Sequence, residues 1–129
     1  MKAVSTKDAP SAIGPYSQGL LSGDFLFVSG QIPIDPETGK LVAGDIKAQT
    51  AQVLDNIEAI LRGAGLGLED VVKVEVYLSD ISDFSDVNEV YASRFVHKPM
   101  PARQAMEVAS LPLGSGLEIS CIAHVKKTG

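Results

Sequence analysis

The feature of this sequence that most constrains its fold is one long apolar stripe at helical spacing. Between Asp45 and Gly65, the apolar residues recur with the period of an α-helix and fall on one face. They are Ile46, Val53, Leu54, Ile57, Ile60, Leu61 and Ala64. Asp45 is a suitable N-cap, and Gly63 and Gly65 favour termination at the other end. The pattern predicts a long amphipathic helix whose apolar face packs on a second layer.

The second layer is predicted to be a β-sheet. Alternation of apolar and polar side chains predicts strands over residues 72–78, 103–108 and 117–125. A hairpin is predicted at 20–28, where the turn Ser22-Gly23-Asp24 joins two apolar runs. The opening segment, up to and including Gln18, is expected to be irregular, and a further short strand is expected near Leu41-Val42.

A second helix is predicted after residue 80. Asp80 or Asp83 is expected to cap it, and the segment His97–Pro101, with its two prolines, requires it to end before residue 97. Its apolar residues are Phe84, Val87, Tyr91 and Phe95. This order of elements predicts an α+β two-layer domain, in which a mixed six-stranded sheet carries both helices on one face. With 129 residues, the chain is expected to form one domain over positions 1–129.

The sheet face away from the helices is predicted to be covered by another subunit. We expect this face to carry polar side chains that alternate with the buried ones along two strands. They are Lys73, Glu75, Tyr77, Arg103, Ala105 and Glu107. The set is too polar for a second core and too rich in small and apolar neighbours for an ordinary solvated surface, so a partner subunit is expected.

Composition excludes several classes of protein. The net charge of −5 and the pI near 4.9 disfavour nucleic acid as a partner, because phosphate binding requires a basic surface. The N-terminal residues contain no apolar run typical of a signal peptide, and no stretch approaches the roughly 18 apolar residues of a membrane helix. A single cysteine fits a reducing compartment. We therefore expect a cytoplasmic protein.

Metal and nucleophile sites are not indicated. His97 and His124 are far apart and belong to no ligand motif, so no metal is expected. Cys121 lies on the apolar side of its predicted strand, where a thiol packs as a small hydrophobic group. The glycines at 63, 65 and 67 follow a helix and cannot present amides to a phosphate at a helix N-terminus.

Four polar features have no structural explanation from the pattern alone. The segment Gly14–Gln18 is a predicted loop that carries the hydroxyl of Tyr16. The segment Ser29–Gln31 places Gly30 at the end of an apolar strand, where the backbone can approach a ligand closely. Arg103 follows a rigid Pro-Met-Pro loop, and a guanidinium is well suited to bind a carboxylate. Glu118 opens the last predicted strand. An ion pair between Arg103 and Glu118, or a simply exposed arginine, is the alternative interpretation.

Several segments together resemble the signature blocks of the Rid (RidA/YjgF) family. The blocks occur in the family's order over most of the chain and are Ala12–Gln18, Ser29–Pro33, Pro101–Arg103, Glu107-Val108 with Leu111-Pro112, and Leu117–Ile119. Asn88 also matches. The resemblance implies a chorismate-mutase-like fold and a homotrimer, with the sheets facing inward and a ligand cleft at each subunit interface.

The resemblance further implies a deaminase without a cofactor. Such enzymes hydrolyse reactive 2-imino and 2-enamino acids, such as 2-aminoacrylate, 2-iminopropanoate and 2-iminobutanoate, to 2-keto acids and ammonia. Arg103 would hold the substrate carboxylate and Glu118 would position or activate water. The residues expected to line the site are Tyr16, Ser29, Gly30 and Asn88. The family often has cysteine where this chain has Ala105, a difference expected to affect substrate preference.

Two other functions use the same residues. A non-catalytic protein that binds small carboxylates such as keto acids would need the same cleft, and a chaperone-like role is a further alternative. Ribonuclease activity has also been proposed within the family, but the acidic composition disfavours RNA as a substrate.

Overall fold

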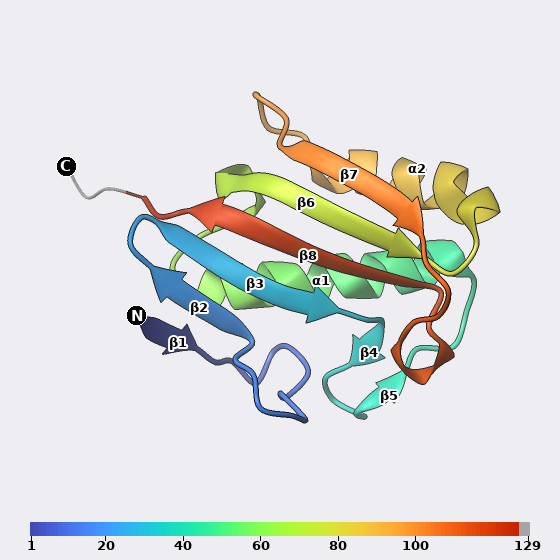
Figure 1. The fold of residues 1–129 in the computed structure, drawn as a ribbon, viewed down its shortest axis with the longest axis horizontal. Helices are drawn as coiled ribbons and strands as arrows, with labels where there is room; N and C mark the ends of the chain where they lie inside the picture. The colour runs from blue at the N-terminus through green and yellow to red at the C-terminus, as the bar shows by residue number, and fades with distance from the viewer. Residues whose placement is uncertain (127–129) are drawn as a thin grey trace.

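The protein folds into two layers, a six-stranded sheet and two helices that cover one of its faces (Figure 1). The computed structural model describes residues 1–126. In spatial order the strands are β1 (Lys2–Val4), β2 (Gly19–Ser22), β3 (Phe25–Gln31), β8 (Leu117–His124), β6 (Val71–Leu78) and β7 (Ala102–Glu107). The helices are α1 (Ile46–Gly63) and α2 (Phe84–Arg94). Among these described strands only β6 and β7 pair in parallel, so the sheet is mixed, as predicted.

Helix α1 confirms the predicted amphipathic helix. The Asp45 side chain accepts a hydrogen bond from the Ala48 N–H at 2.9 Å, which caps the first turn. The helix ends at Gly63, and Gly65 follows with a φ of +75°, a conformation that favours glycine. Its apolar stripe is buried against β3 and β8; the fully buried members are Val53, Leu54, Ile57, Ile60 and Leu61.

The two central strands bury one face each. In β8, Leu117, Ile119, Cys121 and Ala123 are all buried, as their alternation predicts. In β6 the prediction is wrong at its first residue. Val71 is buried and Val72 is 41% exposed, because the register shifts between Val71 and Lys73. A bulge of this kind places one extra residue outside the alternation, and the run of two valines conceals it.

The sixth strand is not where the sequence suggested. Leu41 does lie in a short strand, but β5 (Lys40–Leu41) pairs only with β4 (Ile34–Asp35) in a separate two-stranded sheet. The sixth strand of the main sheet is β1, in the opening segment that was expected to be irregular. A three-residue edge strand is too short to produce a recognisable alternation, and its pairing with β2 forms it.

The structure also corrects the predicted face of β7. Val74, Val76 and Leu78 of β6 are buried on the helix side. The residues in register with them are Arg103, Ala105 and Glu107, which therefore face the helices as well. Ala105 accordingly packs against the core. On an edge strand neither face is fully buried, so alternation alone did not indicate which residues point inward.

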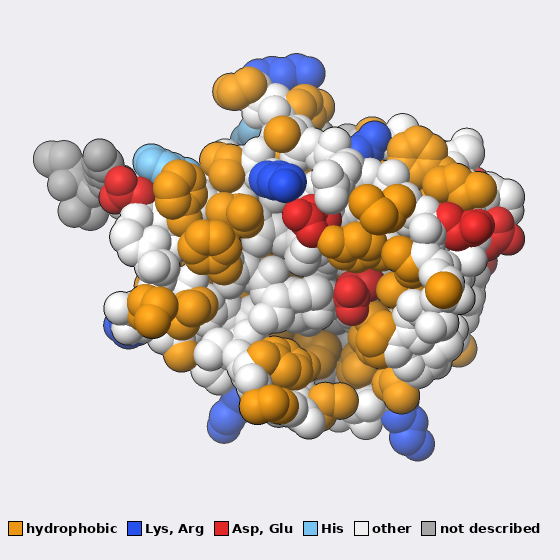
Figure 2. Space-filling model, viewed as in Figure 1, with side chains coloured by type: hydrophobic (Ala, Val, Ile, Leu, Met, Phe, Trp, Pro, Cys, Tyr) orange, Lys and Arg blue, Asp and Glu red, His pale blue; other side chains and the backbone are white. Residues whose placement is uncertain are grey.

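The open face of the sheet is a mixture of apolar and charged side chains (Figure 2). It is formed by the residues that alternate with the core positions of β3, β8, β6 and β7. They include Phe25, Phe27, Lys73, Glu75, Tyr77, Met106, Glu118 and Ile122. Phe27 is 44% exposed and Met106 is 41% exposed. Exposed apolar groups of this size, rimmed by polar ones, are typical of a surface that contacts a partner or ligand.

Two further observations concern the core and the helices. Cys121 is buried in the centre of the sheet, and burial raises the pKa of its thiol to about 12. The thiol is therefore un-ionised and packs as predicted. Within residues 1–126, no helix combines the length and the apolarity needed to cross a membrane.

Candidate functional site

Arg103 lies near the start of β7, with its guanidinium against helix α2. Its Nη1 donates a hydrogen bond of 2.7 Å to Oδ1 of Asn88. The guanidinium carbon lies 4.6 Å from the ring centroid of Tyr91 and 5.4 Å from that of Phe84. Arg103 forms no ion pair with any of residues 1–126. Its charge is therefore held in place by neutral groups and remains available to an anion.

A hollow of about 390 Å³ opens beside this guanidinium, and we call it the Arg103 hollow. Its lining consists of Asn88, Tyr91, Ala92, Phe95, Met100, Pro101 and Arg103. Arg103 is the only charged residue in this set. A carboxylate that enters the hollow would meet a planar donor group surrounded by apolar walls, an environment in which a charge-assisted hydrogen bond is strong.

Glu118 belongs to a second hollow, of about 420 Å³, on the opposite side of the sheet. This Glu118 hollow is lined by Ile13, Tyr16, Ser29, Gly30, Ile32, Pro112 and Glu118. Glu118 is its only charged residue and forms no ion pair with residues 1–126. Burial raises the pKa of the Glu118 carboxyl above its ordinary value. A carboxylate whose pKa is raised is a stronger base than an ordinary one, which suits the acceptance and return of a proton during a reaction.

Gly30 is required by the position of Glu118. The register of β3 with β8 shifts between Val28 and Gln31, and Gly30 lies in this irregular stretch. A Cβ atom at position 30 would lie 2.8 Å from Cδ of Glu118 and 3.0 Å from one of its carboxylate oxygens. The absence of a side chain therefore lets the Glu118 carboxyl lie directly against the backbone of β3.

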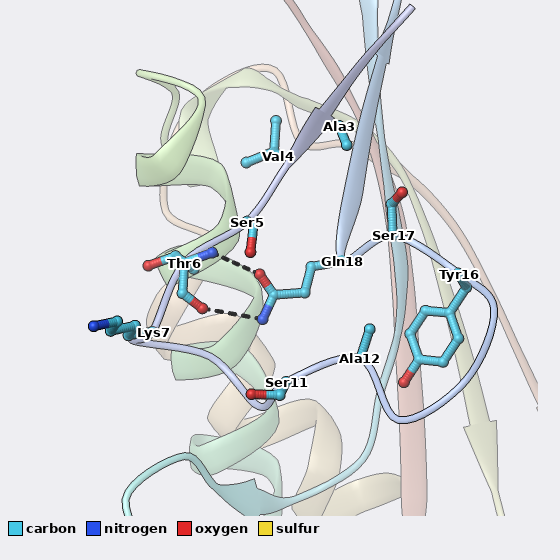
Figure 3. Close-up of a pocket in the computed structure, with 10 residues that line it drawn as sticks. All are labelled: Ala3, Val4, Ser5, Thr6, Lys7, Ser11, Ala12, Tyr16, Ser17 and Gln18. Carbon is cyan, nitrogen blue, oxygen red and sulfur yellow. Dashed lines mark hydrogen bonds between the residues drawn. The ribbon is translucent and has the colours of Figure 1, made fainter.

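The loop that carries Tyr16 is held by the buried amide of Gln18 (Figure 3). Its Oε1 accepts a hydrogen bond from the Thr6 N–H at 2.7 Å. Its Nε2 donates to the carbonyls of Thr6 and Pro10, at 3.1 and 2.7 Å. The Ser29 hydroxyl donates to the Ser17 carbonyl, which joins the loop to β3. Tyr16 and Ser29 are thus positioned together at the rim of the Glu118 hollow.

The six residues selected from the sequence form two groups. Arg103 and Asn88 lie together on the helix side of the sheet. Tyr16, Ser29, Gly30 and Glu118 line one hollow on the open side. An ion pair between Arg103 and Glu118 within one chain, the alternative interpretation, does not form because the two side chains project from opposite faces.

The structure adds aromatic residues that sequence reasoning assigned only to the core. Tyr91 and Phe84 contact the Arg103 guanidinium with their rings. Together with Asn88 they are spaced by four and three residues along α2, which places them on one helix face. This spacing was visible in the sequence, but nothing local indicated that β7 would present an arginine to that face.

We predict that Glu118→Gln increases stability at neutral pH while lowering activity. The folded protein bears the cost of a partly desolvated carboxylate, as the raised pKa of Glu118 indicates. Above that raised pKa the charge opposes folding. As the pH falls through the pKa of Glu118 in the folded protein, this cost to stability decreases. It vanishes below the pKa of a glutamate in the unfolded chain, about 4.3. The difference in Tm between Glu118→Gln and wild type, measured from pH 8 to pH 4, should be positive at neutral pH and approach zero in acid. A Tm for the variant below that of wild type at pH 7 would contradict this prediction.

The chain is similar to known proteins over nearly its whole length. The family model described as endoribonuclease L-PSP matches residues 6–125. A RutC family protein of Pyrococcus horikoshii is 55% identical over 95% of this chain and 97% of its own length. The chloroplastic Reactive Intermediate Deaminase A of Arabidopsis thaliana is 46% identical over 95% of this chain and 65% of its own length.

Solved structures share this fold over nearly the whole chain. The crystal structure of E. coli TdcF with bound serine has a TM-score of 0.92 at 41% identity, covering 98% of this chain and 100% of that one. The family match over nearly the whole chain, with relatives of this identity, shows that the protein belongs to the YjgF or Rid family and shares its chorismate-mutase-like fold.

Proposed function

We propose that the protein hydrolyses small 2-imino and 2-enamino acids to 2-keto acids and ammonia, in clefts between the subunits of a homotrimer. The observation that carries this proposal is the pair of half-sites. Arg103 lines one hollow and the half-buried carboxyl of Glu118 lines the other, and neither has an ion-pair partner among residues 1–126. An enzyme that holds a substrate carboxylate and activates water needs these two groups close together.

Assembly of several copies would bring the half-sites together. Arg103 and Glu118 face opposite sides of the sheet, so one chain cannot place both on the same small substrate. A head-to-tail contact, in which the Arg103 hollow of one subunit meets the Glu118 hollow of the next, completes the site and generates a closed ring. The mixed apolar and charged surface of the open face supports such a contact. The number three follows from the resemblance to Rid proteins.

The proposed reaction uses few groups. Arg103 holds the substrate carboxylate through the donors that Asn88 leaves free, and a backbone N–H near Gly30 assists. The substrate reacts as its protonated imine, C=NH2⁺. Glu118 removes a proton from water as the water oxygen bonds to the imine carbon and the C=N π electrons pass to nitrogen, which forms a neutral carbinolamine. Glu118 then returns that proton to the amine nitrogen. The C–N bond breaks, ammonia departs, and the hydroxyl becomes the keto group as its proton is lost to solvent.

The non-catalytic alternative has one specific observation in its favour. TdcF, which is 41% identical, was crystallised with bound serine, a small carboxylate. A protein that only senses such ligands would use the same Arg103 hollow. The family model's description names an endoribonuclease, but RNA binding is disfavoured here by the net charge of −5.

A coupled assay tests the proposal. A PLP-dependent dehydratase would generate 2-aminoacrylate or 2-iminobutanoate in situ, and keto-acid formation would be followed with and without the purified protein. We expect the protein to accelerate keto-acid release above the spontaneous rate. If 2-oxobutanoate binds but no imine is turned over faster than in buffer, the deaminase is excluded and the binding protein is favoured.

A further inference from the structure

The guanidinium of Arg103 rests on a cluster of aromatic rings from helix α2. Its carbon lies 4.6 Å from the Tyr91 centroid, well within the roughly 6 Å over which a cation is attracted to a ring face. Phe84 approaches from 5.4 Å, and Asn88 accepts a hydrogen bond from one nitrogen. An exposed arginine ordinarily samples many rotamers. Here the three neighbours Phe84, Asn88 and Tyr91 lie on one face of α2. The two rings restrict the orientation of the guanidinium plane, and Asn88 holds one of its edges.

Tyr91 is itself fixed within the core. Only 7% of the residue is exposed, and its ring stacks on Phe95 with centroids 4.4 Å apart and an interplanar angle of 24°. Phe95 is almost completely buried. The stack therefore fixes the orientation of the Tyr91 ring, and the fixed ring face in turn restricts the orientation of the guanidinium above it.

The hydroxyl of Tyr91 takes no part in this arrangement. It is buried and has no hydrogen-bond partner among residues 1–126. Burial raises the pKa of Tyr91, although the neighbouring Arg103 charge opposes the shift, so the ring stays neutral at physiological pH. The contact with Arg103 is consequently made by the ring face and not by a phenolate.

We propose that Tyr91 is a positioning residue for Arg103, a role that rests on the proposed function. The ring of Tyr91, and not its hydroxyl, holds the guanidinium flat against α2 so that the edge opposite Asn88 faces the substrate carboxylate. Pre-organisation of this kind lowers the entropy lost on binding, so it affects affinity for the carboxylate more than the later chemical step.

Two substitutions separate the ring from the hydroxyl. Tyr91→Leu removes the aromatic face, and Tyr91→Phe retains it. Affinity for the product 2-oxobutanoate is measured by titration calorimetry, and kcat and KM are measured with 2-iminobutanoate. We expect Tyr91→Leu to weaken binding and raise KM by about 10-fold, with kcat within about 2-fold of wild type. Tyr91→Phe should stay within about 2-fold in all three quantities, because it removes only an unpaired hydroxyl.

Val87→Ala supplies a matched control for damage to the helix. Val87 is buried on α2 and does not line the Arg103 hollow. Its truncation should lower Tm and leave the Kd for 2-oxobutanoate unchanged. If Tyr91→Leu does not fold, Phe84→Leu tests the same contact from the more distant ring, with an expected weakening of about 3-fold.

The outcomes distinguish this role from the proposed function. The positioning role is overturned if Tyr91→Leu leaves binding unchanged, if Tyr91→Phe is as impaired as Tyr91→Leu, or if Val87→Ala weakens binding equally. If wild-type protein binds 2-oxobutanoate but turns over no imine, the proposed deaminase function is excluded. The calorimetric affinities of the Tyr91 variants for 2-oxobutanoate still decide whether Tyr91 positions Arg103.

Discussion

Replacement of Arg103 by alanine is expected to lower kcat/KM for imine hydrolysis by at least about 100-fold. Two charge-assisted hydrogen bonds to a carboxylate contribute roughly 1.5–3 kcal/mol each, and both are lost. Among residues 1–126 no other cation lines either hollow, so none of them can replace the guanidinium. The side chain is exposed and has no ion-pair partner within residues 1–126, so the fold should lose about 1 kcal/mol or less.

The measurement compares the variant with wild type in the coupled imine assay, alongside thermal unfolding. Arg62→Ala is a suitable control, because Arg62 is an exposed arginine on α1 whose only ion pair within residues 1–126 is with Glu58. It should retain wild-type activity. The activity of Arg103→Lys should lie between those of Arg103→Ala and wild type, because an ammonium keeps the charge without the planar pair of donors. Full activity in Arg103→Ala would show that the carboxylate is bound elsewhere.

Mixing two inactive variants is expected to restore activity. In the proposed ring, each site takes Arg103 from one subunit and Glu118 from the next. A site is intact when an Arg103-bearing Glu118→Ala subunit precedes a Glu118-bearing Arg103→Ala subunit. With random equimolar mixing, each condition holds for half of the subunits, so about one quarter of all sites should be intact. Activity should rise from near zero to about one quarter of the wild-type value.

The experiment requires exchange of subunits. The two variants, carrying different affinity tags, are unfolded together in urea and refolded, and tandem purification verifies mixed assemblies. Each variant refolded alone is the control and should stay inactive. Mixed assemblies without recovered activity would mean that Arg103 and Glu118 do not share a site across subunits. A solution mass equal to one chain would exclude the ring directly.

The elements that sequence reasoning located best are those with strong burial on one side. Helix α1 and strand β8 bury nearly every position of their apolar stripes, so periodicity alone was sufficient. Strand β1 and the bulge at Val72 were missed because both depend on pairing with another strand, β2 in one case and β8 in the other. Pairing between distant segments leaves little trace in local composition.

The candidate site shows the same limit. Gly30 and Glu118 were selected from separate motifs, and their close contact depends on the β3–β8 register. Arg103 was selected as a candidate from its position after the Pro-Met-Pro loop, but its predicted face was wrong because a parallel partner, β6, determines it. Ala105, where the family often has cysteine, faces the core and lines neither hollow. Its proposed effect on substrate preference would therefore be indirect.

The burial of Cys121 gives the protein an internal reporter of its own opening. It is the only cysteine in the chain, it lies between β3 and β6 in the middle of the sheet, and its pKa is about 12. Its side chain lies on the face of β8 that the helices cover, so a thiol reagent can reach it only when the helices and this part of the sheet separate. The rate of thiol labelling under native conditions would therefore measure how often the core opens and exposes Cys121. The dependence of this rate on protein concentration would show how strongly association of subunits suppresses the opening.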